Sequence, residues 1–177
     1  TFLRFQEHYE SPKFMNKVFT HEEFKQWYTK LKGKFTYYQE WDGFNIPSRV
    51  LKRFYQGHFD PLSKNEKMIL ELFRNEKHNF YIIAVHGKEH KEILKHELAH
   101  GLFYTHPAYK KEAINIMKKY SLSHIKKELI SLGGYNKKVL NDEIQAYAIS
   151  LSHELKSEMP KEMKEELTVL FRTFIKK

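Results

Sequence analysis

The chain has 177 residues, of which 41% are hydrophobic and 15% aromatic, so it can bury a core and is not a disordered chain. It contains no cysteine, which excludes disulfides and cysteine-ligated zinc sites. No apolar run approaches the roughly 18 residues of a transmembrane helix. We therefore expect one domain without a membrane span. We see no signal peptide, although the sequence begins at a threonine. The sequence leaves open whether the compartment is cytoplasmic or extracellular, and it does not indicate the oligomeric state.

The formal charge is +9, from 31 lysine and arginine residues against 22 acidic residues. These charges are scattered, without a block of five of one sign, and the sequence has no recognisable nucleic-acid-binding module. A solvated, lysine-rich surface explains them, so we do not expect nucleic acid as a partner. The alternative is a surface that attracts an acidic protein, nucleic acid or anionic lipid.

The N-terminal part of the chain predicts helices and one strand. Residues 1–20 are rich in aromatic side chains but aperiodic, and we expect them to pack over the domain as an extended or short helical segment. The alternation over 34–39 predicts a strand. Capping boxes at Thr20 and Ser63 and the proline at position 47 mark helix starts. The helices that these signals predict lie at 20–32, 47–56 and 64–74.

Residues 80–86 form the clearest predicted strand, because they are β-branched and aromatic. A helix over 88–104 follows at once, and its apolar residues indicate that it is largely buried. Proline, serine and glycine signals predict the remaining helices. They lie at 107–120, from Ser121 or Ser123 to 132, at 139–158 and at 159–177. The expected architecture is a mainly helical α+β domain with one small sheet.

The residues that carry chemistry are His96-Glu97-Leu98-Ala99-His100, an H-E-x-x-H motif. Histidines four apart lie on one helix face, about 5–6 Å from each other at Cβ, so both can bind one metal ion. Neutral imidazole suits Zn²⁺. Glu97 points about 100° round the helix. It flanks the metal without binding it, where a carboxylate can take a proton from a metal-bound water.

A catalytic zinc ion needs a third protein ligand, and the sequence offers two. Glu143 opens a later helix. His106 follows His100 at the spacing of the metzincin pattern H-E-x-x-H-x-x-G-x-x-H, but Phe103 stands where that pattern has glycine, and Pro107 follows directly. We favour Glu143, with His106 as the alternative.

The motif and the downstream helical Glu143 resemble those of the zincin metallopeptidases, and within them the gluzincins. In that family a substrate-binding edge strand, the active-site helix and the glutamate helix follow in this order, as 80–86, 88–104 and 139–158 do here. The resemblance covers about residues 79–158 and identifies no subfamily. It implies a single zincin-like domain over 1–177, divided into an N-terminal part, a catalytic core and a C-terminal helix at 1–78, 79–158 and 159–177.

The resemblance implies a zinc endopeptidase that holds one Zn²⁺ per chain through His96, His100 and Glu143. Glu97 would assist the attack of zinc-bound water on a peptide carbonyl and then protonate the leaving amine. Tyr147, one turn after Glu143, is the candidate to stabilise the oxyanion, although helix packing is its simpler explanation. Weaker candidates for that role are His106, Tyr135 and His153. Asp142 or a backbone carbonyl would orient a zinc-bound histidine.

A protein or peptide substrate would lie along strand 80–86 as an added strand. Two other function classes remain open. A zincin-fold protein could bind metal without peptidase activity. Alternatively, a basic interaction or nucleic-acid-binding protein could carry the motif by accident, which predicts no bound zinc and salt-dependent binding to polyanions.

Overall fold

The computed structural model describes residues 2–40, 43–85, 91–132, 135–150 and 155–175. Helices dominate this part of the chain, and two strands form one antiparallel sheet. In chain order the elements are α1 (Leu3–Glu10), α2 (His21–Lys32), α3 (Tyr37–Glu40), β1 (Gly43–Pro47), the 3₁₀ helix η1 (Ser48–Val50), α4 (Leu51–Tyr55), α5 (Lys64–Leu72), β2 (Tyr81–Val85), α6 (Lys91–Thr105), α7 (Pro107–Met117), α8 (Ser123–Ser131), α9 (Leu140–Ser150) and α10 (Lys161–Ile175).

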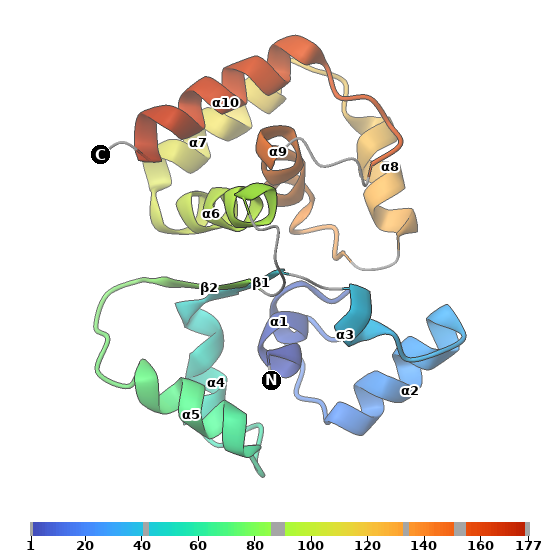
Figure 1. The fold of residues 1–177 in the computed structure, drawn as a ribbon, viewed down its shortest axis with the longest axis vertical. Coiled ribbons are helices and arrows are strands. Elements are labelled where there is room, and N and C mark those ends of the chain that lie inside the picture. The colour runs from blue at the N-terminus through green and yellow to red at the C-terminus, as the bar shows by residue number, and fades with distance from the viewer. Residues whose placement is uncertain (1, 41–42, 86–90, 133–134, 151–154, 176–177) are drawn as a thin grey trace.

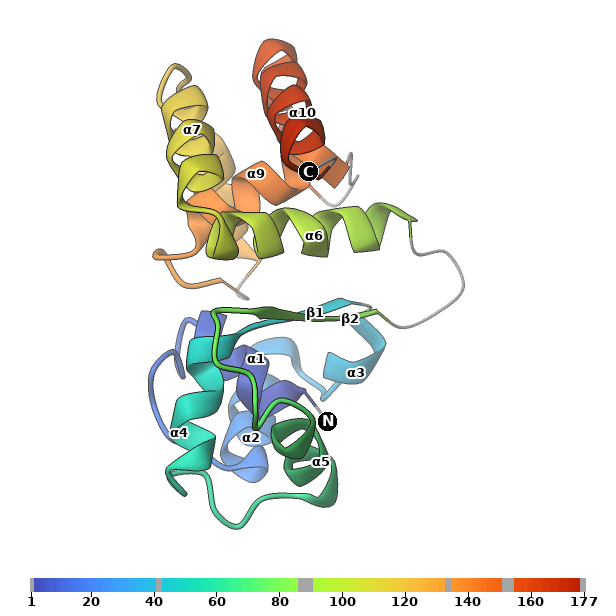
Figure 2. The same ribbon diagram turned by 90° about the vertical axis from the view of Figure 1, so that its left-hand side faces the viewer.

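The elements gather in two lobes, each with its own hydrophobic core (Figures 1 and 2). The N-terminal lobe holds α1 to β2, and the C-terminal lobe holds α6 to α10. Figure 2 shows the sheet at the boundary, with α6 across one face and the N-terminal helices below the other. Val139 belongs to the N-terminal core although it lies beside α9 in sequence, and Tyr135 packs against both cores. The two lobes therefore share an extensive interface.

The sheet faces of β1 and β2 divide their side chains between the lobes. Ile46 pairs with Ile82, and both are buried in the N-terminal core. On the other face, Tyr81 and Ile83 lie within 4 Å of where a side chain on Gly101 of α6 would begin. This alternation follows from the two-residue period of a strand. It places α6 directly over the sheet.

The sequence prediction holds for the mainly helical α+β class and for most helices. Both capping boxes form, at Thr20 and Ser63, and Gly33 ends α2 with φ of +82°. Strand 80–86 is found at Tyr81–Val85. The predicted helix start at 88–90, and His86, lie outside the described residues. Two predicted details are wrong: Leu122 rather than a serine precedes α8, and residues 155–158, the predicted end of the 139–158 helix, are not helical.

The predicted strand over 34–39 is wrong. That stretch leads into α3, where Tyr37 is fully buried among aromatic rings. The strand that pairs with β2 lies at Gly43–Pro47, where the sequence predicts a turn and the start of a helix. Burial of Phe44 and Ile46 against the N-terminal core outweighs the local turn preference.

The first twenty residues contain a buried helix, not a segment laid over the surface. Every residue of α1 is buried. Its polar side chains are Arg4, Gln6, Glu7, His8 and Glu10. Some of these have specific partners: Gln6 Oε1 accepts from the Asn45 backbone at 2.9 Å, and His8 Nδ1 lies 2.8 Å from the carbonyl oxygen of Lys17. Burial raises the pKa of Glu7 to about 8. The sequence of α1 shows no hydrophobic periodicity because the polar and apolar faces of this helix are both buried.

Arg4 and Glu66 form a buried ion pair between α1 and α5. Arg4 Nε and Nη2 donate to the two carboxylate oxygens at 2.7 and 2.6 Å, and Arg4 Nη1 donates to the Phe59 carbonyl at 3.0 Å. Burial alone would raise the pKa of Glu66, but hydrogen bonds from Arg4 and Ser63 lower it below its usual value. The ionised carboxylate therefore stabilises the fold at pH values above about 4.3, the pKa in an unfolded chain, and this stabilisation is lost as the pH falls through the lower folded value.

We predict that Glu66→Gln lowers the free energy of unfolding at pH 7 by about 3–5 kcal/mol, because it leaves Arg4 buried without a counter-charge. The difference from the unsubstituted chain should shrink as the pH falls below about 4. Urea unfolding at several pH values measures both effects. Glu71→Gln is the matched control, since the Glu71–Arg74 pair is exposed and should contribute at most about 0.5 kcal/mol. Equal effects of the two substitutions would contradict the assignment.

Candidate metal centre

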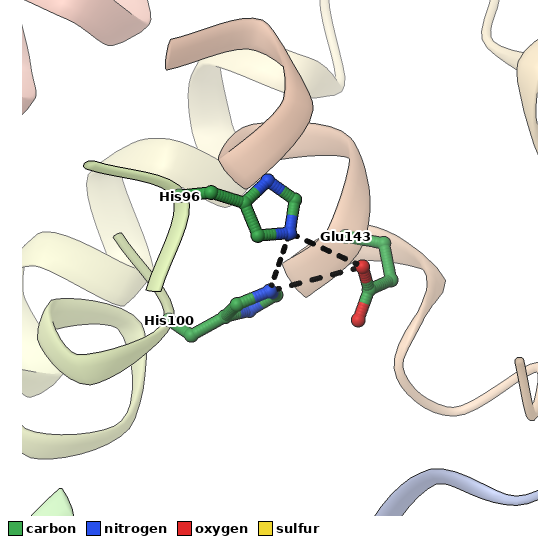
Figure 3. A group of neighbouring side chains, drawn as sticks. All are labelled: His96, His100 and Glu143. Carbon is green, nitrogen blue, oxygen red and sulfur yellow. Dashed lines mark hydrogen bonds and ion pairs between the residues drawn. The ribbon is translucent and has the colours of Figure 1, made fainter. Parts of the chain in front are cut away.

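His96, His100 and Glu143 meet between α6 and α9, as Figure 3 shows. The two histidines lie one helical turn apart on α6, and the glutamate comes from the first turn of α9. The Nε2 atoms of His96 and His100 are 3.1 Å apart. Glu143 Oε2 is 3.8 Å from His96 Nε2 and 3.7 Å from His100 Nε2. This buried group could hold a metal ion.

The spacing of these three atoms agrees with a shared metal ligand set. A tetrahedral ion with bonds of about 2.0–2.1 Å places its ligand atoms about 3.3–3.4 Å apart. The observed separations of 3.1, 3.7 and 3.8 Å bracket this value. Two nitrogens and one carboxylate oxygen are a ligand set typical of catalytic zinc sites. The residues therefore fit the metal that the motif predicts.

The outward-facing ring nitrogen of each histidine has its own partner. His100 Nδ1 donates to Asp142 Oδ1 at 2.8 Å, and His96 Nδ1 lies 3.3 Å from Ser150 Oγ. Such contacts fix the ring so that Nε2 presents its lone pair to a metal. The expected partner of a metal-binding histidine, Asp142, is thus found at His100.

A second layer of contacts comes from α1, which the sequence does not identify as part of the site. Tyr9 donates to Asp142 Oδ2 at 3.1 Å, while Gln145 donates to Asp142 Oδ1 at 3.2 Å. Glu10 is also buried, and its burial and the nearby charge of Glu143 raise its pKa well above the usual value. No local sequence signal links Tyr9 or Glu10 of α1 to a motif nearly ninety positions later. Only their burial beside α9 shows the connection.

The two histidines differ in charge when no metal is bound. Burial alone would lower the pKa of His100, but the charges of Asp142 and Glu143 outweigh it and raise the pKa to about 10. Burial and the neighbouring charge of His100 lower the pKa of His96 well below its usual value. A protonated His100 therefore donates from Nε2 to neutral His96. A metal must displace that proton, so metal affinity should rise with pH.

Glu97 is buried beside the cluster and is not one of its three candidate metal ligands. Its Oε2 atom has no hydrogen-bond partner among the described residues. Burial raises the pKa of Glu97 to about 7, while the charge of His100 and a hydrogen bond with Asn45 lower it less. The backbone of β1 passes so close that a Cβ on Gly43 would collide with Glu97 Oε1. A side chain at position 43 would therefore force the Glu97 carboxylate to move.

Tyr147 lies beside the cluster, whereas His106 does not. The ring of Tyr147 meets that of His96 edge-on at 4.8 Å, and its hydroxyl is 3.0 Å from the Tyr135 hydroxyl. Burial and the charge of Glu143 raise the pKa of Tyr135. His106 is exposed at the start of α7, with Nδ1 2.8 Å from Thr105 Oγ1. His153 lies outside the described residues. The structure thus brings together Glu143, not His106, with the motif.

Comparison of the chain with protein-family models, with curated proteins and with solved structures found no match. We therefore infer function from the geometry of the site and from the resemblance of its motif.

We predict that Glu143→Ala lowers zinc affinity by more than the roughly 10–100-fold that follows loss of an outer contact, because it removes the only charged ligand. Competition with a chromophoric chelator measures the affinity. His106→Ala is the control, since this exposed histidine lies apart from the cluster, and it should leave the affinity unchanged. The reverse order of effects would show that the third ligand is wrong.

We also predict that Asp142→Asn weakens zinc binding by about 10–100-fold while leaving one site per chain, because the amide removes the charge that orients His100. Tyr9→Phe removes only the hydroxyl that holds Asp142, so its effect should be in the same direction and smaller. Zinc titrations of both variants provide the comparison. Unchanged affinity in Asp142→Asn would mean that this contact serves packing alone.

Proposed function

We propose that the protein is a zinc-dependent peptidase of the gluzincin type, which cleaves peptide bonds within a protein substrate. The observation that carries this proposal is the group of His96, His100 and Glu143, with the unpartnered Oε2 of Glu97 buried beside it. A buried carboxylate oxygen without a partner is costly in a purely structural role. The cost has an explanation if that atom receives a proton during a reaction.

The three ligands would hold one Zn²⁺, whose chemistry when bound is to acidify a water molecule and to polarise a carbonyl. The order of elements supports the family proposal, since β2, α6 and α9 follow one another as the edge strand, active-site helix and glutamate helix of gluzincins do. A zincin-like fold is part of the same proposal.

Glu97 would move the proton in this reaction. Its Oε2 would take a proton from the attacking water and pass it to the nitrogen of the departing amine. Contacts on its other side, from Asn45 and the backbone at Gly43, hold the carboxylate in place. Exclusion of bulk water by the sheet and α6 would strengthen its electrostatic interactions.

Tyr147 and Tyr135 would stabilise the negative charge that develops on the substrate carbonyl oxygen. Their hydroxyl groups are 3.0 Å apart, so one of them donates to the other. Contact between the Tyr147 ring and His96 places this pair at the edge of the ligand group.

The substrate would bind in extended form along β2. One edge of β2 pairs with β1, and no strand of the described residues pairs with its other edge. Because Gly43 pairs with Val85 and also lies against Glu97, the Val85 end of β2 is the end nearest the proposed proton acceptor. A peptide added at the open edge would form main-chain hydrogen bonds.

We predict that Glu97→Gln lowers peptide hydrolysis by about 10²–10⁴-fold and retains one zinc per chain, because it removes the proton acceptor but no ligand. Mass spectrometry of a peptide library incubated with the zinc-loaded protein measures cleavage, and elemental analysis measures the metal.

The matched control is Glu92→Gln, an exposed glutamate on the same helix that pairs with Lys95. It should leave cleavage unchanged. Zinc binding with no cleavage by the unsubstituted protein would favour a metal-binding protein without peptidase activity. Absence of bound zinc would favour an accidental motif.

A further inference from the structure

A cavity of about 470 Å³ opens on the N-terminal lobe beside η1 and α4. Its lining contains three permanent cations, Arg49, Lys52 and Arg53, together with His8 and His58, and it contains no carboxylate. This distribution differs from the remainder of the chain, where acidic and basic residues are interspersed. The cavity is therefore a local concentration of positive charge.

The sequence of η1 and α4 explains why these cations share one side. Arg49, Lys52 and Arg53 are three and four residues apart, so they lie on one helical face. Leu51, which lies between them, and Phe54, which follows them, are buried in the N-terminal core. Packing of the apolar face thus fixes the direction of the basic face.

The basic side chains have no ion-pair partner among the described residues. Within the described part of this lobe, Arg4 and Arg74 form ion pairs, and the three cations of the cavity do not. Burial lowers the pKa of His8, and the nearby charge of Arg53 lowers it further, which places these two groups close together. Uncompensated like charges repel one another, and a bound anion would relieve this repulsion.

Two of these groups are held in position before any ligand arrives. The Arg49 guanidinium lies 5.1 Å from the centre of the Tyr9 ring and 5.2 Å from that of Tyr104. His8 Nδ1 donates to the Lys17 carbonyl at 2.8 Å, which fixes the ring in the wall of the cavity. Prior ordering of donors lowers the entropy cost of binding.

We propose that this cavity binds the phosphate group of a phosphorylated small molecule. A phosphate monoester carries nearly two negative charges and accepts several hydrogen bonds, which guanidinium groups supply in a matching planar geometry. The volume lies within the range of about 300–1,000 Å³ of small-molecule sites, so it accommodates more than the phosphate alone. The proposal is independent of the peptidase assignment, although Tyr9 lines the cavity and also binds Asp142.

The probe is phenyl phosphate, titrated into the full chain at about 0.15 M salt, where exposed charges are well screened. Two-dimensional NMR spectra of the backbone amides report binding. We expect one saturable site, with shifts centred on η1 and α4. Arg53→Gln and Lys52→Gln should each weaken binding by about tenfold or more, the effect of losing a hydrogen bond to a charged group. Both side chains are exposed, so thermal unfolding should confirm intact variants.

Arg172→Gln is the matched control, because Arg172 is an exposed arginine on α10 in the other lobe. It should leave binding unchanged. Equal weakening by Arg172→Gln, or no saturation, would overturn the proposal in favour of a diffuse basic surface. Loss of binding in His96→Ala would also overturn it, since the phosphate would then bind at the metal centre. Saturable binding of a glutamate-rich peptide without binding of phenyl phosphate would replace it with an acidic-protein site.

Discussion

The contact between His100 and Asp142 joins α6 to α9 at the most buried point of the candidate site. Nearly complete burial of an imidazole and a carboxylate is costly unless each has a partner, and here the 2.8 Å hydrogen bond supplies it. The same contact orients His100 Nε2 toward His96 and Glu143. Tyr9 and Gln145 donate two further hydrogen bonds to Asp142. Two helices from distant parts of the sequence are thereby fixed in an arrangement that brings the three candidate metal ligands together.

The N-terminal lobe packs against residues of this site. α1 brings Tyr9 to Asp142, and β1 brings the backbone of Gly43 against Glu97. The ion pair of Arg4 and Glu66 anchors α1 in turn to α5. Packing within the N-terminal lobe therefore helps to position Glu97 and, through Asp142, His100. The N-terminal lobe has no recognisable motif, but its contacts hold residues of the candidate metal centre in position.

The sequence is sufficient to predict what depends on local spacing. The H-E-x-x-H helix and both capping boxes are read from residues three or four apart. Glu143 is favoured over His106 because Phe103 departs from the metzincin pattern and Pro107 follows His106, and the structure brings the three expected ligands together. The sequence is insufficient where burial in the core decides the local structure. α1 has polar residues on every face, so periodicity fails, and β1 forms where turn residues precede it because Ile46 is needed in the core. The link from Tyr9 to Asp142 spans 133 positions and has no local signal.

The central claim is that His96, His100 and Glu143 bind one catalytic zinc ion. Its most direct test is the metal content of the purified chain by elemental mass spectrometry, before and after incubation with zinc, alongside His96→Ala. The account predicts about one zinc per chain, with the site lost in the variant. No zinc after incubation, or equal zinc in His96→Ala, would contradict it and would leave the motif as an accident of a histidine-rich sequence.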